Sequence, residues 1–298
     1  MTDNFPVKKP LIGQGWVRAL LFCVCYLGCT LLGIALLPKI TTLLTGELPS
    51  AGNPWNGRFL WITVLIVLFV SFLMVFLFRL LVDRKSFRSM GFAPATNANS
   101  LPGFFLAVSL LGTGTLILYF SHHLKWTDII FNGNDLFIEF GLMGMIAFYE
   151  ETVFRGYILN NLLESMGKWA ALPLSAFLFA LFHVNNPGMN FIAISNIFLA
   201  GLLLGVNYIY TRNLWFSILF HLGWNFFQGP VLGYRVSGIN FSSLLQTELN
   251  GDLIITGGEF GFEGSIVNTA LCLILVLLLN RVYEKKFQPT GQEALVAK

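Results

Sequence analysis

Two neighbouring glutamates and an arginine stand inside a long apolar stretch, in the sequence FYEETVFR that starts at Phe148. Successive residues of a helix are separated by about 100° around its axis, so Glu150 and Glu151 face different directions. Residues four apart share a face, and a glutamate that precedes an arginine is the favourable order. We therefore expect Glu151 to pair with Arg155, which leaves Glu150 free to act on another group.

Two histidines follow the glutamates inside other apolar segments. His183 stands four residues after Phe179, and His221 stands four residues before Asn225. Each histidine alone is as compatible with a structural hydrogen bond between helices as with chemistry. Together with Glu150, however, two imidazoles and an amide supply the groups of a site that activates water and stabilises an oxyanion. The same carboxylate and imidazoles are also suitable ligands for a divalent metal.

The composition indicates that these groups lie in a membrane protein. Of the 298 residues, 55% are hydrophobic and 11% are charged, whereas about 25% are charged in an ordinary soluble domain. Apolar windows of about 17 to 25 residues predict an all-α, polytopic protein with about eight transmembrane helices. The expected spans are residues 17–37, 59–82, 102–121, 136–160, 169–184, 190–211, 213–228 and 265–283. Membrane lipid is an expected partner, and no basic run with interleaved aromatics suggests nucleic acid.

The distribution of lysine and arginine predicts an orientation. If both termini are cytoplasmic, 14 of the 18 basic residues lie on the inner side, as the positive-inside rule requires. The expected organisation is a cytoplasmic segment 1–16, a helical membrane domain 17–284 with a peptidase core at about 136–228, and a cytoplasmic tail 285–298. The loop 229–264, whose charges are mostly acidic, then lies outside.

Three ordered motifs resemble the type II CAAX protease family, whose bacterial branch is often called CPBP or Abi. They are Glu-Glu-x-x-x-Arg at 150–155, Phe-x-x-x-His at 179–183 and His-x-x-x-Asn at 221–225. The resemblance covers the fourth to the seventh expected span. It implies an all-helical intramembrane peptidase in which Glu151 and Arg155 support the helix of the first glutamate.

The resemblance also implies roles for four side chains. Glu150 and His183 would activate water, while His221 and Asn225 would stabilise the oxyanion. The family leaves the need for metal open, so Glu150, His183 and His221 would be the ligands if zinc or another divalent metal is present. The predicted function is hydrolysis of a peptide bond in a membrane-associated peptide or protein, in the inner membrane of a bacterium.

Two other functions are compatible with the same residues. In a proton-coupled transporter, Glu150 and the histidines would relay protons. Inverted repeats would favour such a carrier, and the sequence shows none. A non-catalytic toxin-immunity or scaffold protein would need the polar residues only for structure or binding.

Overall fold

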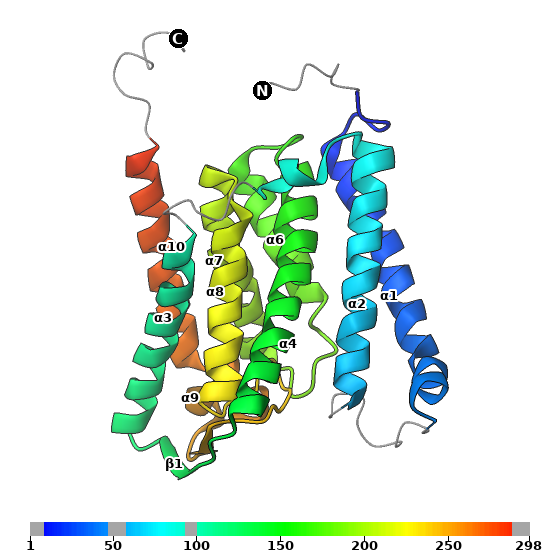
Figure 1. Ribbon diagram of the computed structural model, residues 1–298. Helices are drawn as coiled ribbons and strands as arrows, with labels where there is room; N and C mark the ends of the chain where they lie inside the picture. Colours follow the sequence, from blue (N-terminus) through cyan, green and yellow to red (C-terminus); the bar gives the residue numbers. More distant parts are fainter. Residues whose placement is uncertain (1–8, 47–57, 93–99, 288–298) are drawn as a thin grey trace.

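The computed structural model describes residues 9–46, 58–92 and 100–287, which form a bundle of helices (Figure 1). The long helical stretches are α1 Gly15–Thr45, α2 Arg58–Leu77 with η1 Phe78–Asp83, α3 Leu101–Phe120, α4 Gly133–Glu151 with η3 Thr152–Leu159 and α5 Asn160–Leu162, α6 Lys168–Leu181, α7 Phe191–Thr211, α8 Leu214–Phe226 with η4 Phe227–Val231, and α10 Ile266–Lys286. Each stretch overlaps one of the expected spans, so the predicted all-α polytopic fold is confirmed. Residues 1–8 and 288–298 of the two expected cytoplasmic segments lie outside the described residues.

Not every described helix has the length and hydropathy of a membrane span. Five of the described helices are long and apolar enough to cross a membrane, namely α1, α2 with η1, α3, α7 and α10. Helix α6 is apolar but shorter, and α4 carries several carboxylates. The count of eight spans therefore stays a prediction. Helix α1 is longer than the expected span, because it continues through Pro38 to Thr45.

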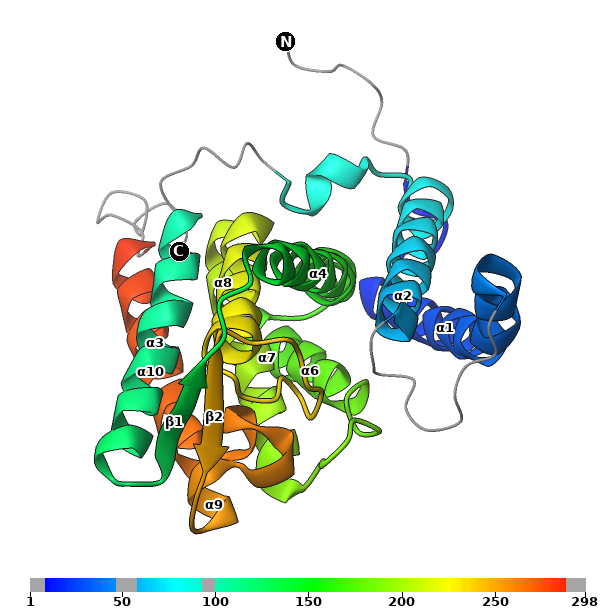
Figure 2. The ribbon, with the colours of Figure 1, turned by 60° about the horizontal axis from the view of Figure 1, so that its bottom comes forward.

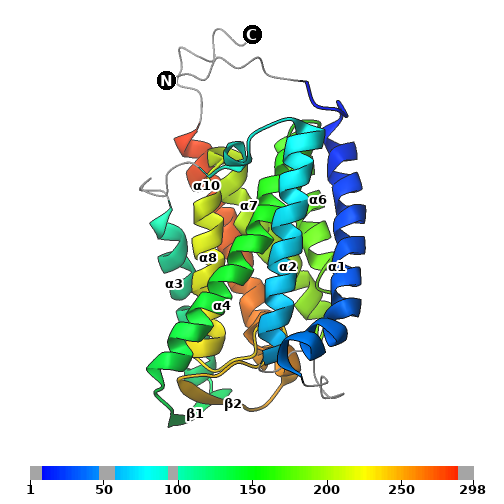
Figure 3. The same ribbon diagram turned by 45° about the vertical axis from the view of Figure 1, so that its right-hand side comes forward.

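The two ends of the bundle differ in structure. Helix α1 begins and α10 ends at one end (Figures 1 and 3). The opposite end carries α9 Leu253–Thr256 and an antiparallel sheet of β1 Leu124–Ile129 and β2 Leu245–Leu249 (Figure 2). The all-α prediction contained no strands. The sequence gives little sign of this sheet, because its two strands are far apart in the chain and no tight hairpin turn joins them.

Helix α8 lies among the other helices and packs against α3, α4 and α7. Small residues permit close approach of helices in a membrane protein. A Cβ atom at Gly103 of α3 would lie 2.5 Å from the carbonyl oxygen of Phe216 on α8. A Cβ atom at Gly201 of α7 would lie 2.8 Å from Ala176 on α6. These tight contacts position α8, which carries His221, and α6, which directly precedes His183.

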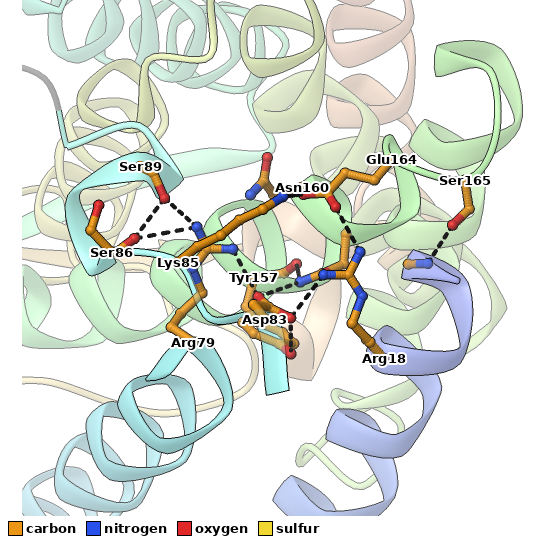
Figure 4. Close-up of polar contacts among 12 residues, drawn as sticks. Arg18, Arg79, Asp83, Lys85, Ser86, Ser89, Tyr157, Asn160, Glu164 and Ser165 are labelled. Atoms are coloured by element: carbon orange, nitrogen blue, oxygen red, sulfur yellow. Dashed lines mark hydrogen bonds and ion pairs between the residues drawn. The ribbon is translucent and has the colours of Figure 1, made fainter. Parts of the chain in front are cut away.

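A buried ionic cluster joins α1 and η1 to the η3–α5 segment near the end where α1 begins (Figure 4). Its centre is Asp83, whose side chain is fully buried. Its carboxylate accepts hydrogen bonds from Arg18 at 3.1 Å and Arg79 at 2.8 Å. Tyr157 and Asn161 donate to the same carboxylate at 3.1 and 3.3 Å. We call these five residues the Asp83 cluster.

Glu164 extends the Asp83 cluster toward solvent. Its carboxylate accepts from Arg18 at 2.6 Å and from Lys85 at 2.5 Å. Partial burial opposes ionisation, but the hydrogen bonds from Lys85 and Arg18 outweigh it and lower the pKa of Glu164 below its ordinary value. The first two helices are thus attached to the rest of the bundle through charged groups as well as apolar packing.

Candidate active site

The last turn of α4 carries both glutamates, and they diverge as helical geometry requires. The Glu151 carboxylate is fully buried, and its Oε1 lies 2.8 Å from Nη1 of Arg155. Arg155 also donates to the carbonyl of Gly201 at 3.3 Å, and its guanidinium lies 4.4 Å from the ring centroid of Phe179. The Glu150 side chain is 14% exposed and lines a cavity. The expected pairing of Glu151 with Arg155 is present.

The chain continues from Glu151 into a π-helical stretch, Thr152–Leu159, without leaving the helix. Such stretches insert an extra residue into a turn, re-aim the side chains that follow, and often occur at functional sites. Thr152 donates to the carbonyl of Phe148 at 2.6 Å at the point where the winding changes. Every residue of the stretch is buried, so Arg155 reaches the protein interior.

Both motif histidines face Glu150. Nε2 of His183 lies 3.9 Å from Oε2 of Glu150, and Nε2 of His221 lies 3.8 Å from the same oxygen. His183 comes from the turn after α6, whereas His221 comes from the middle of α8. Three separate helical segments therefore bring one carboxylate oxygen and two imidazole nitrogens together.

The second nitrogen of each imidazole is held by an acceptor. Nδ1 of His183 lies 2.8 Å from the carbonyl oxygen of Phe179. Nδ1 of His221 lies 2.9 Å from Oε1 of Glu151. A carbonyl or carboxylate oxygen can only accept, so each Nδ1 carries a proton. In a neutral ring this leaves Nε2 as the acceptor on the side of Glu150.

A cavity of about 240 Å³ contains the three groups and also Asn225. Asn225 follows His221 by one turn of α8, and both side chains line the cavity. Its walls are otherwise largely apolar, with contributions from α1, α2, α4, α6, α7 and the segment after η4. A mostly apolar cavity with a few convergent polar groups is typical of a site that binds a ligand and excludes bulk water.

Sequence reasoning missed three features of this site. Glu151 bridges Arg155 and His221, although the i,i+4 spacing predicted only the arginine as a partner. The hydroxyl of Tyr149 donates to Oε1 of Glu150 at 3.4 Å. Glu263, expected in an outer acidic loop, is buried and lines the same cavity. The Glu151–His221 contact and the burial of Glu263 depend on tertiary packing, which residue spacing within one helix does not report, whereas the Tyr149 contact joins neighbouring residues of α4.

The described residues do not favour a metal site. Among residues 9–46, 58–92 and 100–287, no group of three or more histidine, cysteine, aspartate or glutamate side chains is arranged to hold a metal ion. Zinc ligands lie about 2.0–2.2 Å from the ion. Glu150, His183 and His221 converge around one carboxylate oxygen, but nothing among the described residues supports the metalloprotease part of the prediction.

The chain was compared with known proteins. Residues 132–227 match the family model described as type II CAAX prenyl endopeptidase, Rce1-like. The match covers 96 of the 298 residues, about a third of the chain. The Rce1-like region extends from just before α4 to the start of η4, so it contains all three motifs, and the resemblance noted from them is confirmed. At the level of the family, the match supports an intramembrane protease. Among curated proteins, none matches the chain.

Proposed function

We propose that the protein is an intramembrane endopeptidase that hydrolyses a peptide bond in a membrane-associated peptide or protein. The observation that carries the proposal is that His183 and His221 present imidazole nitrogens 3.9 and 3.8 Å from one oxygen of Glu150. These separations are too long for direct hydrogen bonds, and they suit a water molecule that contacts all three groups. The Rce1-like match supports the same reaction class.

Glu150 is proposed to act as the general base. It removes a proton from water as the water oxygen attacks the scissile carbonyl carbon, and it later gives that proton to the departing amine. His183 accepts a hydrogen bond from the second water proton at Nε2, because its own proton lies on Nδ1 against the Phe179 carbonyl. The carboxylate therefore ends the reaction in the ionised state in which it began.

His221 and Asn225 are proposed to stabilise the oxyanion. When the carbonyl carbon becomes tetrahedral, its oxygen gains negative charge that positioned donors stabilise. The Asn225 amide can donate directly. His221 donates from Nε2 when its ring carries two protons, with Nδ1 held by Glu151 at 2.9 Å. Glu151 is then a positioning residue for His221, and Arg155 balances its charge.

Replacing Asn225 by alanine is expected to lower kcat for peptide cleavage by about 10²-fold, because one oxyanion donor is lost. KM should change much less, since the donor acts mainly in the transition state. The kinetics of purified protein measure both quantities. Asn280→Ala on α10, outside the Rce1-like region, is the matched control and should retain wild-type kcat. An unchanged kcat for Asn225→Ala would exclude this residue from the oxyanion site.

Metal dependence can be tested separately. We expect cleavage to persist after dialysis against a chelator, because the described residues contain no group of three or more histidine, cysteine, aspartate or glutamate side chains arranged to hold a metal ion. The measurement is the cleavage rate before dialysis, after dialysis, and after addition of Zn²⁺. Loss of activity on chelation and its recovery with Zn²⁺ would instead assign Glu150, His183 and His221 as ligands.

The function itself is tested by the products formed in a membrane. Membranes that carry the wild-type protein are compared, by sequencing of peptide termini, with membranes that carry the Glu150→Gln variant. We expect at least one new terminus that appears only with the wild type, and it would identify the substrate. Identical termini in both membranes would count against a peptidase.

We also propose a bacterial inner membrane with both termini in the cytoplasm. Helix α1 begins and α10 ends at the same end of the bundle (Figure 1). The excess of basic residues expected on this side, 14 of 18, agrees with the positive-inside rule. In this orientation the β1–β2 sheet and α9 lie on the outer side.

A further inference from the structure

We propose that Glu263 forms a second position in the cavity, which selects a cationic group of the peptide substrate. The inference rests on the proposed peptidase function and adds a substrate class to it. The cation is a lysine or arginine side chain near the scissile bond, or the free amino terminus of the peptide. These sources share a positively charged hydrogen-bond donor.

Glu263 is held in place by neutral donors. Its Oε1 accepts a hydrogen bond from the indole of Trp224 at 3.0 Å. Its Oε2 accepts from the backbone N–H and the hydroxyl of Ser237 at 2.7 and 2.9 Å. The residue is only 7% exposed. An ionised carboxylate can accept about four hydrogen bonds, so these three contacts fix its direction and leave one acceptor position.

The negative charge of Glu263 has no fixed partner. No lysine or arginine is among the described residues that line the cavity, and none of the described ion pairs includes Glu263. Two arginines of neighbouring segments are paired with other carboxylates, since Arg155 pairs with Glu151 and Arg235 pairs with Glu259. A buried carboxylate without a cation is unfavourable. A cationic substrate group would supply the missing charge.

Glu263 is also close in the structure to the residues proposed for catalysis. Trp224, which donates to it, directly precedes Asn225 on α8. Glu263 and Glu150 line the same cavity, although Glu150 begins the first motif and Glu263 follows the last motif by 38 residues. A peptide whose carbonyl lies at Glu150 and Asn225 therefore has neighbouring residues within the space that Glu263 faces. Two carboxylates in one cavity also disfavour an anionic group there.

The test uses the full-length protein in nanodiscs and a set of apolar fluorogenic peptides. Each peptide carries one lysine, norleucine or glutamate at a varied position near the cleaved bond, with a free or an acetylated amino terminus. We expect wild-type kcat/KM to be about 10- to 100-fold higher for lysine than for norleucine at one position, as for a hydrogen bond to a charged group. Glutamate at that position should be cleaved least. If the amino terminus supplies the cation, acetylation should cause the same loss.

Three variants test whether the charge of Glu263, rather than a change in structure, causes the preference for lysine over norleucine. Glu263→Gln should reduce this ratio of kcat/KM values to about threefold or less. Ser237→Ala removes one hydrogen bond but leaves the carboxylate, so the preference should remain. Glu248→Gln removes an exposed carboxylate on β2 and should change nothing. Binding of the lysine and norleucine peptides to Glu150→Gln protein provides a readout that needs no turnover, and the lysine peptide should bind more tightly.

The outcomes distinguish this inference from the proposed function. If Glu150-dependent cleavage and binding are equal for lysine and norleucine at every position, and acetylation has no effect, only the cation position is wrong. If the preference survives in folded Glu263→Gln protein, Glu263 is not its source. If Glu150→Gln cleaves as fast as wild type, Glu150 is not the base, whereas the peptidase assignment itself fails if wild-type protein cleaves none of the peptides. The wild-type peptide comparison remains decisive even if Glu263→Gln does not fold.

Discussion

Glu150→Gln is expected to lower the rate of peptide cleavage by about 10³- to 10⁴-fold, the upper range for loss of a general base. Glutamine preserves the size of the side chain but cannot take a proton from water. Because Glu150 lines the cavity and makes no short ion pair, its replacement should leave the fold intact. The measurement is kcat/KM of purified wild-type and variant protein on the same peptide, together with their unfolding temperatures.

A carboxylate on the same helix provides the control for this result. Glu139→Gln changes α4 three turns away from Glu150 and outside the cavity, so it should cleave at nearly the wild-type rate. If Glu139→Gln lost as much activity as Glu150→Gln, the cause would be a general effect on α4. If folded Glu150→Gln protein retained wild-type activity, this residue would not be the base.

Asp83→Asn is expected to have the largest effect on stability. Asp83 is fully buried and is the acceptor for four donors of the Asp83 cluster, including the guanidinium groups of Arg18 and Arg79. Removal of one partner leaves buried positive charge without compensation, which costs about 3–5 kcal/mol. The unfolding temperature should fall by about 10 °C. A thiol-reactive dye can follow this transition, because Cys23 and Cys272 are free and buried.

Two further variants test the cause of that loss. Glu164→Gln changes a carboxylate that is 28% exposed, so it should cost about 1 kcal/mol or less. The double variant Asp83→Asn with Arg79→Met removes an acid and a base together and should regain part of the lost stability. Equal unfolding temperatures for Asp83→Asn and wild type would show that the cluster contributes little to folding.

The local geometry of the site was accessible from the sequence, because it depends on helical spacing. The i,i+4 rule predicted the pair of Glu151 and Arg155, and the 100° rotation between neighbours predicted that Glu150 would face elsewhere. The order of the three motifs also indicated that His183 and His221 belong to the same site as Glu150. What spacing could not supply was the second partner of Glu151, since His221 lies on another helix.

The depth of the histidines could not be derived from counting residues. At 1.5 Å per residue, His183 is roughly 22 Å along from the start of α6, whereas His221 is roughly 10 Å from the start of α8. Both nevertheless reach the same oxygen of Glu150. Helices α6 and α8 therefore start at different levels or have different tilts, and packing sets both properties.

The burial of several charged side chains could also not be predicted from the sequence. Arg18, Arg79 and Arg155 are among the 14 basic residues that the sequence places on the inner side, but their side chains are buried and paired with carboxylates. Composition alone does not distinguish a basic residue that faces lipid headgroups from one that neutralises an acid inside the protein. Likewise, Glu263 was assigned to the outer acidic loop because its tertiary contacts with Trp224 and Ser237 have no local signal.

The pairing of β1 with β2 has a consequence for synthesis of the chain. The strands are the two ends of a segment that contains α4 to α8, and Leu124 lies opposite Leu249. Because the N-terminal part of a chain is made first, the helices that carry Glu150, His221 and Asn225 and the turn that carries His183 are synthesised before β2, whereas Glu263 follows it. The sheet can therefore form only after α4 to α8 have been made, and a chain that ends before residue 245 would contain Glu150, His183, His221 and Asn225 without the strand that pairs with β1.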